Sequence, residues 1–354
     1  MLARYTLNVH NTPTEDGEQL VRLGGELNLT TRASASGASK DTLVLEVIAD
    51  FEPPDRVKSV FSDLANDILP SDAKPYETLG FRVEPGQSLN RHVPAPNVLP
   101  EAFQEFSRML RAELSNAARR VYKLYRWRTD SYVTDRRGFS SQGFRYSLDG
   151  ELWFHLPAPG SVRTSAVGHV NFRNGLFEAA VQPMLDLAVD EPLGFELLSE
   201  AAELSSTSRR GALVVAVAAL EVGVKSFIGA LVPKAEWLVM HLPSPPVKRL
   251  LVEYLPGLPV VTRLPSGAVR PPPDGTLEVI RDAVERRNGI THRGGETTIE
   301  FVDETIQAVS DTLRLLDYYA GHSWATDYMS YEFAVVLGLR ERDEESDAFL
   351  DRKS

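Results

Sequence analysis

The chain has 354 residues, 43% hydrophobic and 25% charged, which is ordinary for a soluble protein and at roughly 100–200 residues per domain predicts two domains. Cysteine is absent, which excludes disulfide bonds, thiolate zinc sites and cysteine nucleophiles. The formal net charge of −11 disfavours a protein that coats nucleic acid indiscriminately.

The first residues, MLARYTLNVH, contain no long apolar core behind a basic segment. We therefore expect no signal peptide, and a cytoplasmic location. The absence of cysteine fits this location.

Residues 1–185 predict a mixed α/β domain, whose family the sequence does not identify. The segments RYTLNV, ELNLTTR and TLVLEVIADF have the alternating or apolar pattern of strands. Two dipeptides, Asp149 with Gly150 and Asn174 with Gly175, each stand between strand-like runs. Because such dipeptides accept the positive φ of tight turns, both predict β-hairpins.

One long amphipathic helix is predicted within this domain, with apolar residues such as Phe103 and Leu110 at every third or fourth position. Its end, ARRVYKLYRWR, mixes five basic residues with Tyr122, Tyr125 and Trp127. The rings could stack on nucleic-acid bases. Alternatively, they pack inside the domain while the cations offset the helix dipole, and we favour this interpretation.

Residues 186–325 predict a bundle of four or five helices, so the fold class is α+β, and residues 326–354 are expected to form a polar tail. The most apolar run, residues 212–232, is interrupted by Glu221 and Lys225. We therefore expect a buried helix rather than a membrane span, and no membrane partner. The last helix is predicted to begin at a capping box of Thr297 and Glu300 and to stop at Gly321.

The segment RRNGITHRGG, residues 286–295, joins the last two predicted helices. Asn288 and Gly289 both tolerate left-handed backbone angles, so the preceding helix is expected to end there. The chain could then turn and bring His292 back beside Arg287, which a straight helix would not do.

An arginine beside a histidine suits phosphodiester chemistry. A guanidinium binds phosphate oxygens and the charge that grows in the transition state, whereas an imidazole accepts or donates a proton near neutral pH. Asn288 could hold the substrate or fix the imidazole tautomer. RNA supplies its own nucleophile, the 2′-hydroxyl, so no metal or cofactor is required. The alternative is that Arg287 and His292 only bond exposed carbonyls and close a helix junction.

The stretch from Arg287 to His292 matches the Arg-X4–6-His pattern of HEPN domains, including the polar residue favoured after the arginine. The preceding segments, ELLSEAAELSS, two arginines and ALVVAVAALEVGVKSFI, are similar to the first two helices of the Apea-like bacterial branch of that family. The resemblance covers roughly residues 190–321. It implies a helical bundle that dimerises and faces two motifs across one cleft.

Many members of this family are metal-independent ribonucleases of toxin, antiphage defence or RNA-processing systems, and they leave 2′,3′-cyclic phosphate ends. The resemblance thus implies RNA as substrate, a homodimer, Arg287 at the scissile phosphate, His292 as general acid or base, and Asn288 in support. Other members bind nucleotides or only mediate assembly. In that alternative the chain is a catalytically inactive module, and its first domain engages a protein partner.

Glu221 lies where related sequences often carry a glutamate, so it could orient Arg287 or Asn288 across the bundle. It could instead pair with Lys225 at the i, i+4 spacing. Four further arginines could track an RNA backbone or simply form a solvated face: Arg209, Arg210, Arg286 and Arg293. The six other histidines lie in strand-like segments, a proline-rich loop or near helix ends, and we expect no catalytic role for them.

Overall fold

A computed structural model describes residues 1–10, 19–24, 27–36, 42–78, 81–90, 92–129, 139–157, 177–235, 237, 241 and 246–342. The chain forms two compact units. The sheet unit comprises Met1–Tyr125 and Arg136–Asp190, and the helical unit comprises Arg126–Asp135 and Glu191–Ser354. The α+β class is confirmed. The division at residue 190 lies close to the predicted one at 185, although the end of the long helix belongs to the helical unit.

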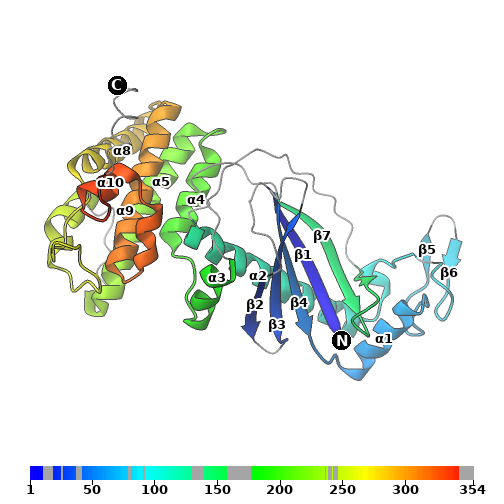
Figure 1. Ribbon diagram of the computed structural model, residues 1–354. Coiled ribbons are helices and arrows are strands. Elements are labelled where there is room, and N and C mark those ends of the chain that lie inside the picture. Colours follow the sequence, from blue (N-terminus) through cyan, green and yellow to red (C-terminus); the bar gives the residue numbers. More distant parts are fainter. Residues whose placement is uncertain are drawn as a thin grey trace. The chain divides into compact units, whose positions relative to one another are not determined.

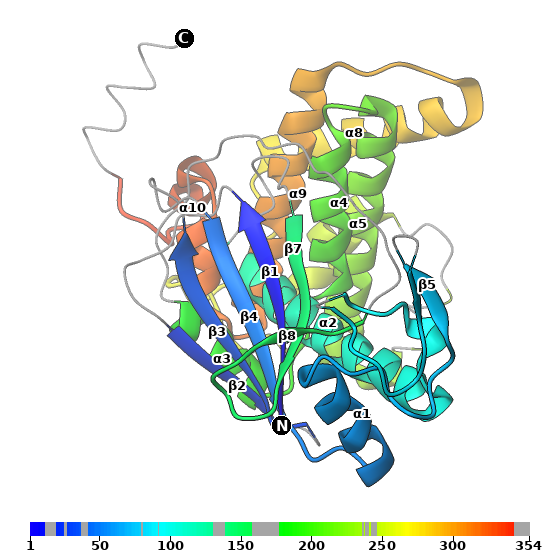
Figure 2. The same cartoon turned by 90° about the vertical axis from the view of Figure 1, so that its right-hand side faces the viewer.

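The sheet unit is built on one antiparallel sheet in the strand order β2-β3-β4-β1-β7-β8 (Figures 1 and 2). β1 lies inside the sheet, paired with β4 on one side and with β7 on the other. A separate hairpin joins β5 (Tyr76–Thr78) to β6 (Phe81–Val83). The sheet strands are β1 (Leu2–His10), β2 (Gln19–Gly24), β3 (Leu29–Ser36), β4 (Thr42–Asp50), β7 (Phe139–Ser147) and β8 (Phe154–His155).

Helices α1 (Asp55–Ala65) and α2 (Glu101–Thr129) contribute the core that packs with β7. Phe61 of α1 lies 4.9 Å from the ring of Phe103 in α2 and 4.8 Å from that of Tyr146 in β7, measured between ring centroids. All three side chains are buried. The predicted long helix is therefore present, whereas α1, which follows Pro54, was not foreseen.

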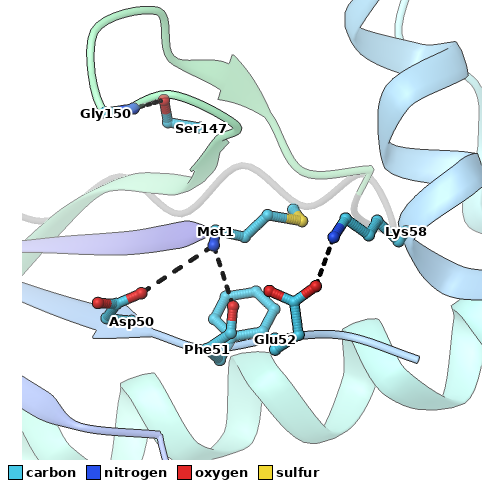
Figure 3. A network of polar contacts seen from close by, with 7 residues as sticks. All are labelled: Met1, Asp50, Phe51, Glu52, Lys58, Ser147 and Gly150. Atoms are coloured by element: carbon cyan, nitrogen blue, oxygen red, sulfur yellow. Dashed lines mark hydrogen bonds and ion pairs between the residues drawn. The ribbon is translucent and has the colours of Figure 1, made fainter. Parts of the chain in front are cut away.

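Polar contacts hold the start of β1 against the end of β4 (Figure 3). The amino group of Met1 donates to the carbonyl of Phe51 at 3.0 Å and lies 4.0 Å from the carboxylate of Asp50. Lys58 of α1 pairs with Glu52 just beyond β4. These contacts connect strand and helix at one edge of the core.

The hairpin predicted at Asp149 and Gly150 is confirmed, since β7 pairs with β8 across this turn. Gly150 has φ +87°, and its amide donates to the hydroxyl of Ser147 at 2.8 Å (Figure 3). The second predicted hairpin is wrong in its later half, because α3 (Phe177–Asp186) is a helix that buries Val181. Asn174 and Gly175 themselves lie outside the described residues.

The helical unit is a bundle in which α4, α5, α8 and α9 pack side by side (Figures 1 and 2). Its elements are α4 (Leu193–Leu204), α5 (Arg209–Leu231), η2 (Pro233–Ala235), α7 (Val247–Arg249), η3 (Leu250–Tyr254), η4 (Leu255–Gly257), α8 (Asp274–Arg293), α9 (Ile299–Tyr319), η5 (Ser323–Tyr328) and α10 (Tyr331–Val336).

α5 is the predicted apolar helix, and by length and composition it could cross a membrane. Within the bundle, however, nine of its side chains are buried against neighbouring helices. The approach of α4 to α5 depends on glycine, because a Cβ added at Gly194 would lie 3.0 Å from the Cα of Gly223. The apolar run therefore serves as the centre of a bundle.

The rings at the end of α2 are buried, as the packing interpretation requires. Trp127 is 1% exposed and donates its indole N–H to the Asp317 carboxylate at 3.0 Å. Arg126 forms two hydrogen bonds to Glu191, at 2.6 and 2.7 Å. Arg126 and Trp127 belong to the helical unit, and Tyr122 and Tyr125 are buried as well. These rings therefore do not form a stacking surface for bases.

The polar tail predicted for residues 326–354 begins too early. Helix α10 follows η5 and buries Phe333 and Ala334, and Leu337 is buried just beyond it. The carboxylate of Asp311 in α9 accepts hydrogen bonds from the amide and the hydroxyl of Ser330, both at 2.7 Å. The bundle thus extends past residue 325, and residues 343–354 lie outside the described part of the chain.

Candidate functional site

Helix α8 does not end at Asn288 and Gly289 as predicted, but continues to Arg293. Its left-handed cap is Gly294, with φ +69°, whose amide donates to the carbonyl of Ile290 at 3.0 Å. Gly289 keeps helical angles. The prediction was wrong because the sequence offers two possible glycine caps, Gly289 and Gly294. The helix uses the second and is more than one turn longer than predicted.

A continuous α8 separates the two residues that were expected to meet. Five positions along a helix correspond to a rotation of roughly 140° and a rise of about 7.5 Å. Arg287 points toward the bundle with a side chain 17% exposed, whereas Asn288 and His292 are exposed. Within one chain, the structure therefore does not bring His292 beside Arg287.

Arg287 is instead held by Glu221 of α5. Its Nη2 donates to Oε1 of Glu221 at 2.6 Å, and the two side chains are only 17% and 16% exposed. Of the two interpretations of Glu221, the contact across the bundle is thus formed. The Nε of Arg287 is buried without a hydrogen-bond partner among the described residues. This ion pair fixes a guanidinium close to the end of α8.

Two of the four further arginines lie at the same end of the bundle. Arg209 and Arg210 begin α5 and are exposed, and Nη1 of Arg210 lies 3.5 Å from the carbonyl of Gly294. The pKa of Glu300 is lowered by its own backbone amide and by the Thr298 hydroxyl, and the charge of Arg209 adds to this effect. The start of α5 therefore meets the end of α8 and the start of α9.

Arg286 and Arg293 line a shallow hollow of about 410 Å³ beside α8. The guanidinium of Arg286 lies over the Phe301 ring, 3.8 Å from its centroid. Three carboxylates share the hollow with the two guanidiniums, those of Asp282, Glu285 and Glu296. Because negative side chains outnumber positive ones there, the hollow is not a phosphate site by itself.

The cap of α9 differs from the predicted capping box by one residue. Helix α9 begins at Ile299, so Thr298 is the N-cap, and its hydroxyl accepts from the amide of Phe301 at 3.3 Å. The hydroxyl of Thr297 is buried without a hydrogen-bond partner among the described residues. The two adjacent threonines made the register ambiguous in the sequence.

A second buried charge pair lies in α9 and was not predicted from the sequence. Arg314 is fully buried, and its Nη1 lies 3.7 Å from Oδ2 of Asp317. Burial raises the pKa of Asp317 to about 7, although the nearby Arg314 charge and the Trp127 hydrogen bond act in the opposite direction. The available signal was the i, i+3 spacing of a basic and an acidic residue within the mostly apolar last two turns of α9.

Comparison with known proteins does not assign this arrangement. No protein-family model, no curated protein and no solved structure matches the chain.

Proposed function

We propose that the chain is a metal-independent endoribonuclease of the HEPN type, acting in the cytoplasm in a defence, toxin or RNA-processing system. The observation that carries the proposal is the ion pair between Arg287 and Glu221. It holds a guanidinium within one and a half turns of an exposed histidine, at the end of the bundle where Arg209 and Arg210 are also exposed.

In the proposed reaction, a base removes the proton of the RNA 2′-hydroxyl, whose oxygen attacks the adjacent phosphorus. The bond to the 5′-oxygen breaks, and that oxygen receives a proton, which leaves a 2′,3′-cyclic phosphate and a 5′-hydroxyl end. His292 serves as the general acid or base. Arg287 stabilises the charge on the phosphate oxygens, and Asn288 supports the substrate or the imidazole.

The separation of Arg287 and His292 on α8 limits how they can share one phosphate. A homodimer formed through the helical unit would offer Arg287 of one chain and His292 of the other to the same RNA strand. Arg209, Arg210, Arg286 and Arg293 would then contact the RNA backbone on either side. The proposed enzyme is therefore a dimer with composite sites.

A second candidate is favoured by the same continuous helix. If Arg287 only balances Glu221, the bundle is an inactive interaction or nucleotide-binding module. The sheet unit would then engage a protein partner. In this case His292 is an ordinary exposed residue of α8.

The deciding experiment incubates the purified protein with a mixed RNA pool in EDTA and compares it with Arg287→Lys, Arg287→Ala and His292→Ala. We expect cleavage with cyclic-phosphate ends, lost in His292→Ala and in both Arg287 variants. Arg281→Ala is the matched control, because Arg281 is an exposed arginine of α8 that pairs with Asp282.

If neither the wild-type protein nor the variants cleave RNA, even with cell extract added, the ribonuclease proposal is contradicted. Saturable binding of a mononucleotide that requires Arg287 would then indicate a nucleotide-binding module. Partner capture that requires residues 1–185 but neither Arg287 nor His292 would indicate an interaction module.

A further inference from the structure

The sheet unit contains a pocket of about 400 Å³ between the end of α1, the loop after β6 and the β7–β8 hairpin. Its lining combines three aromatic side chains, Tyr146, Trp153 and Phe154, with three polar ones. The size falls within the usual range of small-molecule sites, which are mainly apolar with a few polar groups that fix the ligand.

The aromatic wall is held in place by contacts outside the pocket. The guanidinium of Arg4 lies 4.2 Å from the centroid of the Trp153 ring, and Arg4 is itself paired with Glu46 at 3.3 Å. Tyr146 is buried, donates its hydroxyl to the Phe61 carbonyl at 3.3 Å, and lies 5.4 Å from the ring of Phe154. Tyr146 thus supports the wall from below, and the half-buried rings of Trp153 and Phe154 offer pre-positioned surface for stacking.

The polar side chains are His92, His155 and Asp67. Neither histidine has another candidate functional residue close to it in the sequence. Both line the pocket because the loop after β6 faces β8. Asp67 adopts a left-handed conformation, φ +63°, which is uncommon for a residue other than glycine. The Ser88 hydroxyl donates to its Oδ2 at 2.8 Å, and the Leu89 amide donates to its carbonyl at 2.7 Å. The carboxylate is therefore held at the pocket by the loop.

We propose that this pocket binds a nucleobase, as a free nucleoside or as an unpaired base of RNA. A planar base presents apolar faces to the aromatic wall and polar edges to the carboxylate and the imidazoles. An ionised carboxylate can only accept hydrogen bonds, so Asp67 selects bases that carry an exocyclic amino group, as guanine, adenine and cytosine do and uracil does not. The inference concerns the sheet unit and does not depend on RNA cleavage by the helical unit.

The test titrates the full-length protein with guanosine, adenosine, cytidine and uridine by calorimetry, with toluene as an aromatic probe that lacks hydrogen-bonding groups. We expect saturable binding of at least one amino-bearing base and weaker binding of uridine and toluene. Trp153→Ala should weaken binding on the order of tenfold to a hundredfold, as expected for loss of base stacking, whereas Trp153→Phe should retain most of it. Asp67→Asn, which tolerates the same backbone angles, should weaken binding roughly tenfold.

Two controls keep the result interpretable. Trp237→Phe alters a tryptophan outside the pocket and should leave binding unchanged. Ala65→Phe fills the pocket from α1 and should abolish binding without removing any polar or aromatic group, even if Trp153→Ala does not fold.

A competition experiment distinguishes the two sources of the base. A single-stranded oligonucleotide that competes with the nucleoside would identify the source as RNA, and one that does not would identify a free nucleoside.

The proposal is overturned if no nucleoside binds saturably, or if Ala65→Phe binds as well as the wild type. It is also overturned if toluene binds as tightly as the nucleosides, because the pocket would then select for apolar surface alone.

Discussion

At the residue scale, the ion pair between Arg287 and Glu221 is mostly buried, so the stability of the bundle should depend on both charges. Replacing one member leaves the other desolvated without its partner, so Glu221→Gln and Arg287→Met should each lower the free energy of unfolding by about 1–3 kcal/mol. The double variant should lose less than the two single losses added together. Denaturant unfolding of the four proteins measures this coupling.

The matched comparison is the same cycle with Lys225→Met in place of Arg287→Met. A helical i, i+4 pair contributes only about 0.3–0.5 kcal/mol, so its coupling with Glu221 should be the smaller one. A larger coupling with Lys225 would mean that Glu221 serves mainly its own helix and that Arg287 is only a neighbour.

Asp317 gives a prediction on pH. Its pKa in the folded protein, about 7, lies above the ordinary value of 3.8 because the carboxyl is buried. The folded state therefore binds a proton more tightly than the unfolded state. This contribution to stability is fully present below about pH 4 and is lost as pH rises to about 7.

Asp317→Asn removes this titration while retaining an oxygen that can accept from Trp127. The free energy of unfolding of the wild type, relative to the variant, should fall between about pH 4 and pH 7 and then stay level. Chemical denaturation at several pH values checks this. Parallel curves for the two proteins over that range would contradict a raised pKa of Asp317.

At the scale of elements, the sequence predicts best where a pattern is long and has one interpretation. The repeat that includes Phe103 and Leu110 predicted α2, and the turn at Asp149 and Gly150 predicted the β7–β8 hairpin. The sequence does not predict where a helix begins or ends when two neighbouring residues could both cap it. Thr297 and Thr298 are both possible caps, and each glycine of residues 286–295 is a possible helix end.

The candidate site shows the same limit. That Glu221 lies across from Arg287 could be anticipated from the resemblance to HEPN domains. The position of His292 could not, because it depends on where α8 ends, and one turn of helix changes its direction relative to Arg287. The shared position of His92 and His155 could not be predicted either, because only the tertiary fold places them in one pocket.

The end of α8 can be tested with two glycine substitutions. Gly289 has helical angles, and an added Cβ would meet only the flexible end of Arg293 at 3.4 Å. Gly289→Ala should therefore stabilise the protein by about 0.5–1 kcal/mol. Gly294 has φ +69°, so Gly294→Ala should destabilise it by about 1–2 kcal/mol. Thermal and denaturant unfolding compare the two, and the opposite order would restore a helix end at Asn288.

At the scale of the whole molecule, positive charge is concentrated in one segment of the chain. The helical unit carries a local excess of positive charge, with twelve Lys and Arg against seven Asp and Glu between Thr207 and Arg293, although the chain as a whole is acidic. Such a distribution directs an anionic substrate toward one region while the remainder repels it. This is the arrangement expected of an enzyme that contacts RNA locally rather than coating it.

If the proposed sites are composite, two inactive variants should restore each other. In a heterodimer of Arg287→Ala and His292→Ala, one site lacks both residues, while the other combines an intact Arg287 with an intact His292. Random exchange makes about half of the dimers heterodimers, so the mixture should recover about a quarter of the wild-type activity. A site within one chain would recover nothing, because each chain lacks one residue. The assay mixes the two proteins in the partially unfolded state, refolds them together and measures RNA cleavage in EDTA. Each variant refolded alone is the control.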